Sequence, residues 1–222
     1  MKPQGNTISN MKILSHRGYW KAVEEKNTSP AFERSFSLGF GTETDIRDLN
    51  GELVVSHDMP REGGLRASEL FEIHRSNDSG LPLALNIKSD GLQSALLKLL
   101  EEYSVEEYFL FDMSIPDALV SLRHGLKCFT RQSEYEAVPA FYAEAEGVWI
   151  DAFHGEWWDE SVIQEHLNAG KKVCLVSPEL HRRPHGTCWE QIAGWSAISN
   201  PDLILCTDLP EAARAAFGHM VQ

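Results

Sequence analysis

The sequence of 222 residues lacks three features that would each point to a particular class of protein. Its four cysteines include no CxxC pair, which argues against a zinc site or a disulfide framework and favours buried free thiols. It has no apolar run of the roughly 18 residues that a membrane span needs. Residues 1–10 also lack the apolar core of a signal peptide. We therefore expect a cytoplasmic protein with no stable membrane insertion.

Basic residues are also scarce, with 20 Lys and Arg against 33 Asp and Glu and a formal net charge of −13. Such a surface repels a phosphate backbone, so no nucleic-acid partner is expected. A small anionic ligand stays open, because a metal ion and a few basic groups can reverse the local field. No low-complexity linker divides the chain. We expect a disordered extension over residues 1–11 and one domain over 12–222, and the sequence leaves the oligomeric state open.

Short β-rich runs alternate with amphipathic helical runs about eight times along the chain. The predicted strands are 12–16, 41–47 with a hairpin arm at 52–57, 82–88, 108–113, 126–131, 147–152, 171–176 and 202–207. The predicted helices are 28–39, 66–76, 92–103, 116–124, 137–145, 159–169, 187–197 and 209–217. Eight β-then-α units of roughly 25 residues favour an α/β fold, a closed (β/α)₈ TIM barrel, over an open doubly wound sheet.

Two short segments predict particular local structures, a hairpin turn and a helix start. Asn50-Gly51 stands between two strand-like runs and predicts a two-residue hairpin. Asp208 to Glu211 reads as a capping box with Pro210 in the first turn of the last helix, so Asp208 is expected to cap that helix.

Polar residues gather where the predicted strands end, and barrel enzymes place their sites at that rim. Glu43 and Asp45 lie two apart in one strand, so their carboxylates point to the same face and offer hard oxygen ligands for Mg²⁺ or Ca²⁺. The hairpin returns a second strand, which ends at His57, beside this acidic pair. Taken alone, such a pair of acids is more often a solvated strand edge than a metal site.

Two histidines end apolar β-runs in this first quarter of the chain, His16 and His57. Near a phosphodiester, one would deprotonate the attacking oxygen and the other would protonate the leaving oxygen. Arg17 would bind phosphate oxygens as a planar fork. These residue types suit metal-assisted cleavage of a phosphodiester.

At this point the sequence resembles the glycerophosphodiester phosphodiesterase family. The matching segments are His16-Arg17-Gly18, Asn27-Thr28 with Ala31-Phe32, Glu43-Thr44-Asp45, Gly51 with Val54 to Asp58, and Thr207-Asp208 with Pro210. The resemblance implies a (β/α)₈ barrel, a divalent cation held by Glu43, Asp45 and Asn86, and His16 and His57 as the acid/base pair. Arg17 and Lys88 would bind the substrate, a small phosphodiester.

The chain departs from the family pattern in ways that bear on the chemistry. Asn86 stands where the family has a glutamate, which removes one negative charge and is expected to weaken cation binding, with Asp112 available to compensate. Lys26 stands where the family has the glutamate of its helix-start motif. Only 27 residues separate Asp58 from Asn86, too few for the insertion that caps the glycerol side in typical members.

Three hypotheses about the function follow, and the sequence leaves all of them open. The first is a metal-dependent phosphodiesterase acting on a glycerophosphodiester or a similar small phosphodiester. The second is a phosphodiester lyase that stops at a cyclic phosphate. The third is an inactive barrel that binds a phosphorylated ligand through Arg17 and Lys88. This hypothesis stays open because Asn86 is expected to weaken cation binding.

Overall fold

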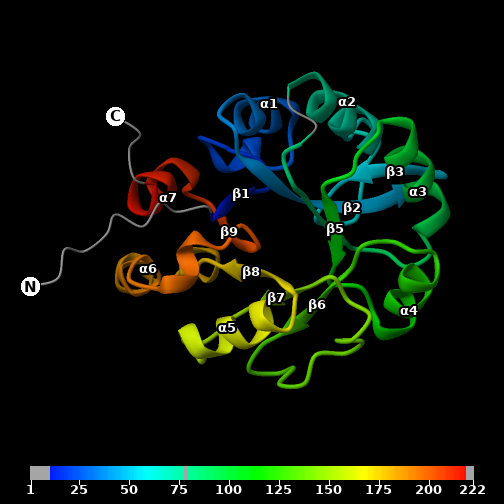
Figure 1. The fold of residues 1–222 in the computed structure, drawn as a ribbon. Coiled ribbons are helices and arrows are strands. Elements are labelled where there is room, and N and C mark those ends of the chain that lie inside the picture. The colour runs from blue at the N-terminus through cyan, green and yellow to red at the C-terminus, as the bar shows by residue number, and fades with distance from the viewer. Residues whose placement is uncertain (1–10, 78–79, 219–222) are drawn as a thin grey trace, which may run out of the picture.

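The computed structural model describes residues 11–77 and 80–218, which form a ring of parallel strands surrounded by helices (Figure 1). The eight parallel strands are β1 Lys12–His16, β2 Gly41–Leu49, β4 Leu83–Ile87, β5 Tyr108–Phe111, β6 Phe129–Gln132, β7 Gly147–Ile150, β8 Lys172–Val176 and β9 Leu203–Thr207. They are ordered β5-β4-β2-β1-β9-β8-β7-β6 around the ring. A single bridge between Leu110 and Cys128 joins the two ends, β5 and β6. The predicted TIM barrel is confirmed, and it is nearly closed.

Within residues 11–77 and 80–218, seven α-helices lie outside the ring of strands. They are α1 Ser29–Ser37, α2 Ala67–Asn77, α3 Gln93–Glu102, α4 Ile115–Arg123, α5 Glu160–Asn168, α6 Gly186–Ala193 and α7 Pro210–Phe217. Three short 3₁₀ turns add η1 Val23–Glu25, η2 Pro178–His181 and η3 Ser196–Ser199. The seven α-helices agree with seven of the eight predicted helices to within four residues at each end. In the part of the chain that the structure describes, no helix has the length and apolarity to cross a bilayer.

The predicted helix over 137–145 is wrong, because this segment forms turns instead. Pro139 has no amide hydrogen to donate, and Phe141 adopts a positive φ of 54° that a right-handed helix does not allow. The backbone carbonyls of the segment are satisfied elsewhere. Thr130 Oγ1 donates to the Ala140 carbonyl at 2.6 Å, and Gln132 Nε2 donates to the Ala137 carbonyl at 3.1 Å. A loop therefore covers the outer face of β6.

The predicted hairpin at Asn50-Gly51 is confirmed. β3 Glu52–Val55 pairs antiparallel with β2, and both turn residues have positive φ, 53° and 87°, as a two-residue type I′ turn requires. The Ser56 amide then donates to the Asp45 carbonyl at 3.0 Å. The hairpin is thereby fixed next to the acidic pair on β2.

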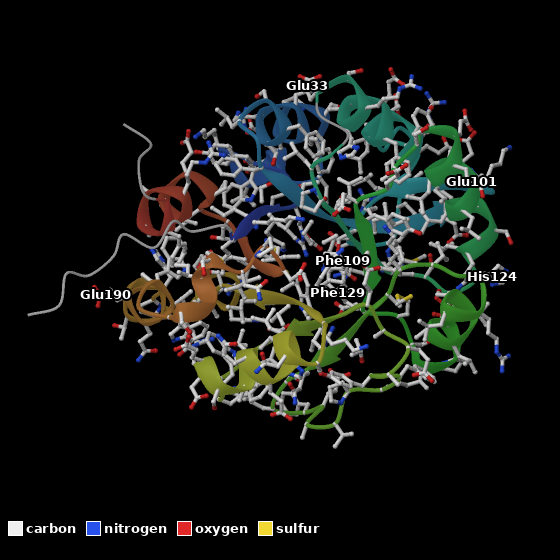
Figure 2. The ribbon with its side chains drawn as sticks, in the orientation of Figure 1. Glu33, Glu101, Phe109, His124, Phe129 and Glu190 are labelled. Carbon is white, nitrogen blue, oxygen red and sulfur yellow. The ribbon has the colours of Figure 1, made fainter. Side chains whose placement is uncertain are left out.

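The apolar side chains divide into an inner cluster and two outer ones. The inner cluster fills the barrel, where Phe109 stacks on Phe129 at 3.7 Å between ring centroids and Phe111 stacks on Trp149 at 3.9 Å. Figure 2 shows Phe109 and Phe129 near the middle of the molecule, while the labelled Glu33, Glu101, His124 and Glu190 lie toward its outside. The two outer clusters lie between the strands and the helices of each half.

The four cysteines are free and buried, as predicted. Burial raises the pKa of each thiol, so all four stay protonated near neutral pH. The predicted N-terminal extension, residues 1–11, lies outside the described residues except for Met11. Met11 is buried against the outer cluster of the C-terminal half.

Gly41 begins β2 where no side chain fits. A Cβ there would lie 2.4 Å from the Pro82 carbonyl oxygen and 2.6 Å from Leu14 Cδ2. We expect Gly41→Ala to lower the free energy of unfolding by about 1–3 kcal/mol, as overpacking of a closed core does. Gly155→Ala, where nothing lies within 4 Å, is the control. Urea unfolding curves compare the two, and equal midpoints would contradict the close packing at Gly41.

Candidate active site

The alternation of strand side chains brings the predicted site residues to one end of the barrel. Residues two apart in a strand point to the same face. Leu14, Ala84, Phe129, Trp149 and Cys206 belong to the inner cluster. The next inward-facing position, two residues later in each strand or just after its end, holds a polar residue. These polar residues are His16, Asn86, Arg131, Asp151 and Asp208. The inner wall therefore changes from apolar to charged at the carboxyl rim, where barrel sites lie.

The three predicted cation ligands lie side by side on β2 and β4. Asp45 pairs in register with Asn86, and Glu43 lies one inward position earlier on β2. All three side chains are buried, and each has one oxygen without a hydrogen-bond partner. These oxygens are Glu43 Oε2, Asp45 Oδ1 and Asn86 Oδ1. A buried oxygen left unpaired is costly, and a hard divalent cation takes oxygen ligands of these kinds. The residues present therefore fit a bound cation.

The site holds two carboxylates and one amide in place of three acids. Among residues 11–77 and 80–218, no group of three or more His, Cys, Asp or Glu side chains is placed to hold a metal ion. Burial and the neighbouring charge of Asp45 raise the pKa of Glu43 well above its usual range. A cation would reverse both effects, because it offsets the lost hydration and screens the two carboxylates from each other.

Basic groups surround Asp45. Arg17 Nε lies 3.0 Å from Asp45 Oδ2, and Lys88 Nζ lies 3.5 Å from Asp45 Oδ1. Asn27 Nδ2 donates to Asp45 Oδ2 at 2.9 Å, and Asn27 Oδ1 accepts from Thr44 Oγ1 at 2.9 Å. Arg17 and Lys88, both predicted to bind phosphate, are therefore on the rim next to the predicted cation ligands. Sequence analysis did not assign Asn27 a role of its own, although it lies in the matched segment.

Asn86 is anchored by its amide nitrogen. Asn86 Nδ2 donates to Asp112 Oδ2 at 3.1 Å, and Arg131 donates to Asp112 Oδ1 through Nε at 3.1 Å and through a second nitrogen. Both carboxylate oxygens of Asp112 therefore have donors. The expectation that Asp112 compensates for the missing glutamate as a ligand is not supported by this geometry. Asp112 instead holds the Asn86 amide so that Oδ1 remains the unpaired atom.

His16 lies between two carboxylates. Its Nδ1 is 2.7 Å from Asp208 Oδ1, and its Nε2 is 3.8 Å from Glu43 Oε2. Burial lowers the pKa of His16, and this effect outweighs the hydrogen bond to Asp208, which acts in the opposite direction. The ring is therefore neutral near pH 7. A neutral ring that donates from Nδ1 to Asp208 leaves Nε2 as the proton acceptor.

The prediction that Asp208 caps the last helix is wrong. The Leu209 amide donates to Thr207 Oγ1 at 3.0 Å, whereas the Asp208 carboxylate bonds His16 and accepts from Trp20 Nε1 at 3.3 Å. Pro210 does occupy the first turn, as predicted. Burial alone would raise the pKa of Asp208, but the hydrogen bond from His16 and nearby charges lower it. Cys206 faces the barrel interior, and Asp208 lies two residues later, so strand alternation places Asp208 on the same inward face. This alternation is the sequence signal that points to a role for Asp208 in the site.

His57 lies at the end of the hairpin, away from the buried centre. Its side chain is 46% exposed, and its Nδ1 lies 2.8 Å from Asp58 Oδ1. His57, Arg17, Lys26 and Asn27 line one groove with a volume of about 1180 Å³. Arg17 directly follows His16 at the end of β1, and it lines the same groove as His57. His16 itself does not line this groove.

Other polar strand ends are occupied by local contacts. Asp151 Oδ1 lies 2.6 Å from His181 Nε2 and accepts from the Ala152 amide at 2.9 Å. Glu179 Oε1 accepts from the Asp208 amide at 3.1 Å, so it fixes the loop that carries Asp208. Trp149 is buried within the inner cluster. These contacts stabilise the rim on the side opposite the predicted cation ligands.

No protein-family model matches this chain, and no curated protein matches it either. Solved structures do. A glycerophosphodiester phosphodiesterase from Agrobacterium tumefaciens superposes with a TM-score of 0.68 at 16% identity, covering 92% of this chain and 99% of the other. A phosphodiesterase from Oleispira antarctica, solved with the product sn-glycerol-3-phosphate, gives 0.64 at 18% identity, covering 92% and 96%.

A Ca²⁺-dependent phosphatidylinositol-specific phospholipase C from Streptomyces antibioticus is more distant, with a TM-score of 0.54 at 11% identity over 94% of this chain and 98% of the other. All three likenesses extend over nearly the whole chain. Identities this low show a shared fold and do not by themselves carry an activity from one protein to another. The chain therefore has the barrel fold found in glycerophosphodiester phosphodiesterases.

Proposed function

We propose that this protein is a divalent-cation-dependent phosphodiesterase that cleaves a glycerophosphodiester or a similar small phosphodiester. One observation carries the proposal. Glu43, Asp45 and Asn86 each have a buried oxygen without a hydrogen-bond partner at the carboxyl rim, beside a neutral histidine and two basic groups. A barrel used only for packing would not keep three such oxygens buried without hydrogen bonds. The likeness to phosphodiesterases of the same fold supports the same proposal.

In this proposal Glu43, Asp45 and Asn86 hold the cation, either Mg²⁺ or Ca²⁺. When bound, the cation supplies charge stabilisation to a phosphoryl oxygen. Arg17 and Lys88 lie against Asp45. With a cation sharing the charge of Asp45, these two basic side chains are free to orient the phosphate oxygens.

His16 is proposed as the general base. Its ring is neutral, Asp208 fixes the proton on Nδ1, and Nε2 is available to accept a proton from the attacking hydroxyl. His57 is proposed as the general acid that protonates the leaving alcohol. It lines the same groove as Arg17, so it can meet the leaving alcohol of a diester whose phosphate Arg17 binds.

Two steps are possible at phosphorus, and they give different products. Attack by a neighbouring hydroxyl of the substrate forms a cyclic phosphate, and attack by water forms a monoester. Phosphorus NMR of the protein with a panel of glycerophosphodiesters, in Mg²⁺, in Ca²⁺ and in EDTA, tests the proposal. A cation-dependent monoester identifies a hydrolase, and a persistent cyclic phosphate identifies a lyase. If no diester is cleaved under any condition, the proposal fails in favour of a barrel that only binds phosphorylated ligands.

Replacing either histidine is expected to abolish turnover while leaving the barrel folded. His16→Ala removes the base and His57→Ala removes the acid, and each loss is expected to lower kcat by about 10²–10⁴. The measurement is the phosphorus NMR time course, with circular dichroism as the check on folding. His124→Ala, on the outer surface at the end of α4, is the matched control. Near-normal kcat in either site variant would exclude the two-histidine mechanism.

Asn86→Glu is expected to tighten cation binding, because it adds a third negative charge to the ligand set. Calorimetric titration with Mg²⁺ and Ca²⁺ measures the change, which we expect to be about tenfold or more in Kd. Glu43→Gln, which removes a charge from the same set, should weaken binding. An unchanged Kd in Asn86→Glu would mean that residue 86 does not contact the cation.

Asp208→Asn tests how His16 is held. Asparagine keeps the size of the side chain but does not stabilise a protonated imidazole or fix the proton on Nδ1, so kcat should fall by about 10²-fold or more. Cation affinity should stay within about twofold, because Asp208 is not in the proposed ligand set. A variant with normal kcat would show that the bond between Asp208 and His16 serves only the loop.

A further inference from the structure

Lys26 is a basic residue of the groove that the proposed chemistry does not use. It lines this groove, which has a volume of about 1180 Å³, together with Arg17 and His57. Lys26 directly follows the 3₁₀ turn η1, and its amide donates to the Val23 carbonyl at 3.2 Å. Its side chain is 23% exposed. The charge of Lys26 is therefore within reach of a ligand in the groove.

The backbone holds Lys26 next to Arg17. The amide of the following residue, Asn27, donates to the Arg17 carbonyl at 2.9 Å. The Asn27 side chain is also fixed, because it bonds both Asp45 and Thr44. The segment that carries Lys26 is thus anchored at the rim, beside the residue that is proposed to bind phosphate.

The ammonium group of Lys26 is partly engaged. Its Nζ lies 4.4 Å from the centroid of the Trp20 ring and 3.7 Å from Asp208 Oδ2. The second distance is longer than a hydrogen bond, and the other carboxylate oxygen of Asp208 bonds His16. An ammonium has three donors, and Asp208 does not use them up. Lys26 therefore has donors for an anionic group of a ligand.

The groove is lined by two segments of the chain that differ in charge. In the first, residues 17 and 26–30, the charged residues are Arg17 and Lys26, both basic. The second, residues 49–69, is mainly acidic. Its charged side chains, apart from His57, are Glu52, Asp58, Glu62, Arg66 and Glu69. An anionic group in the groove is attracted to the first segment and repelled by the second.

The two cations of the first segment lie against different acids. Arg17 Nε is 3.0 Å from Asp45, one of the predicted cation ligands. Lys26 instead lies near Asp208, on the Nδ1 side of the His16 ring, whereas Nε2 of the ring faces the predicted cation ligands. A phosphate at these ligands meets Arg17. Lys26 is left for a second group, further along the ligand.

We propose that Lys26 binds a carboxylate on the leaving alcohol of the substrate, so that the protein prefers diesters with an acidic leaving alcohol. This inference rests on the proposed function, in which His57 protonates the leaving alcohol in the same groove. One ammonium matches the single charge of a carboxylate, and the acids of the second segment disfavour the larger charge of a phosphate monoester. A neutral or cationic alcohol gains no such contact.

The first measurement is kcat/KM for two glycerol phosphodiesters of nearly equal size. The leaving alcohol is 3-hydroxypropionate in one and 3-hydroxypropionamide in the other, so the two diesters differ by one charge. A hydrogen bond between two charged groups is stronger than one to a neutral group, so we expect kcat/KM to be about tenfold higher for the carboxylate. The diester of choline, a cationic alcohol, should be the slowest of the three.

Lys26→Met keeps the length of the side chain and removes its charge. We expect it to bring the ratio of kcat/KM for the carboxylate and the amide close to one, and we expect Lys26→Glu to favour the choline diester. Lys21→Met is the matched control. Lys21 Nζ also lies over an aromatic ring, 3.9 Å from the Tyr19 centroid, and near an acid, 3.6 Å from Glu211, but it does not line the groove. The control should keep the ratio of the original protein.

A binding measurement needs no turnover. Calorimetry compares 4-phosphonobutyrate, which joins a phosphonate to a carboxylate, with 4-phosphonobutyramide, in which the carboxylate is replaced by a neutral amide. Both are titrated in Mg²⁺ and in EDTA. The carboxylate compound should bind about tenfold more tightly, and Lys26→Met should remove this difference in Kd.

The outcomes separate this inference from the proposed function. A difference in Kd that Lys26→Met removes supports the role of Lys26 even when no diester is cleaved, and then only the proposed function fails. Equal Kd and equal kcat/KM for carboxylate and amide overturn the role of Lys26 and leave the phosphodiesterase proposal standing. A preference that Lys26→Met leaves intact also overturns it, even if kcat falls for both diesters, because Lys26 then acts only on Asp208. If neither phosphonate binds and no diester is cleaved, both proposals fail.

Discussion

The burial of Glu43 next to Asp45 is the constraint on which the rest of the site depends. Two carboxylates removed from water repel each other, and neither can be left without compensation. Arg17 and Lys88 approach Asp45, and Asn27 donates to it, yet one oxygen on each acid has no hydrogen-bond partner. Under the proposed function, a cation bound here would offset the repulsion between the two carboxylates.

Each of the outer residues of the site positions an inner one. Asp208 holds His16 by Nδ1, and Asp112 holds Asn86 by its amide nitrogen. In both cases the contact leaves the atom on the far side of the group available, Nε2 of the histidine and Oδ1 of the asparagine. Arg131 in turn balances the charge of Asp112. Asn86, the one uncharged residue among the predicted cation ligands, thus has a partner that orients it.

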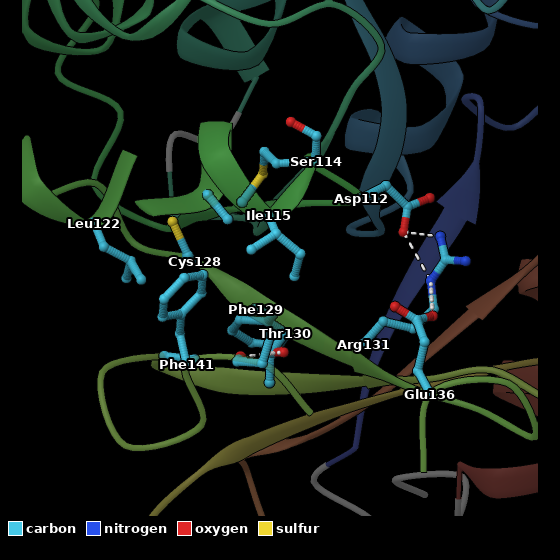
Figure 3. Close-up of a pocket in the computed structure, with 14 residues that line it drawn as sticks. Asp112, Ser114, Ile115, Leu122, Cys128, Phe129, Thr130, Arg131, Glu136 and Phe141 are labelled. Carbon is cyan, nitrogen blue, oxygen red and sulfur yellow. Dashed lines mark hydrogen bonds and ion pairs between the residues drawn. The ribbon is translucent and has the colours of Figure 1, made fainter. Parts of the chain in front are cut away.

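The irregular part of the barrel lies between β5 and β6. One bridge joins these strands, and a loop with Pro139 and a left-handed Phe141 replaces the expected helix. A regular helix would bury the outer face of β6 and close the space beside it. A cavity of about 440 Å³ lies in this region, lined by residues of α4, β6 and the loop (Figure 3).

Strand alternation and helical periodicity are local properties of the chain, so the barrel and most of the rim could be predicted from the sequence. Seven of the eight predicted helices are present, as is the hairpin at Asn50-Gly51, and Glu43, Asp45 and Asn86 lie at the rim. Other features depend on contacts between parts of the chain that are far apart in the sequence. Asp208 reads locally as a helix cap, and its bond to His16 joins residues 192 positions apart. The loop over 137–145 has helical composition, but its carbonyls find partners on β6, and contacts of that kind do not exist until the barrel has closed.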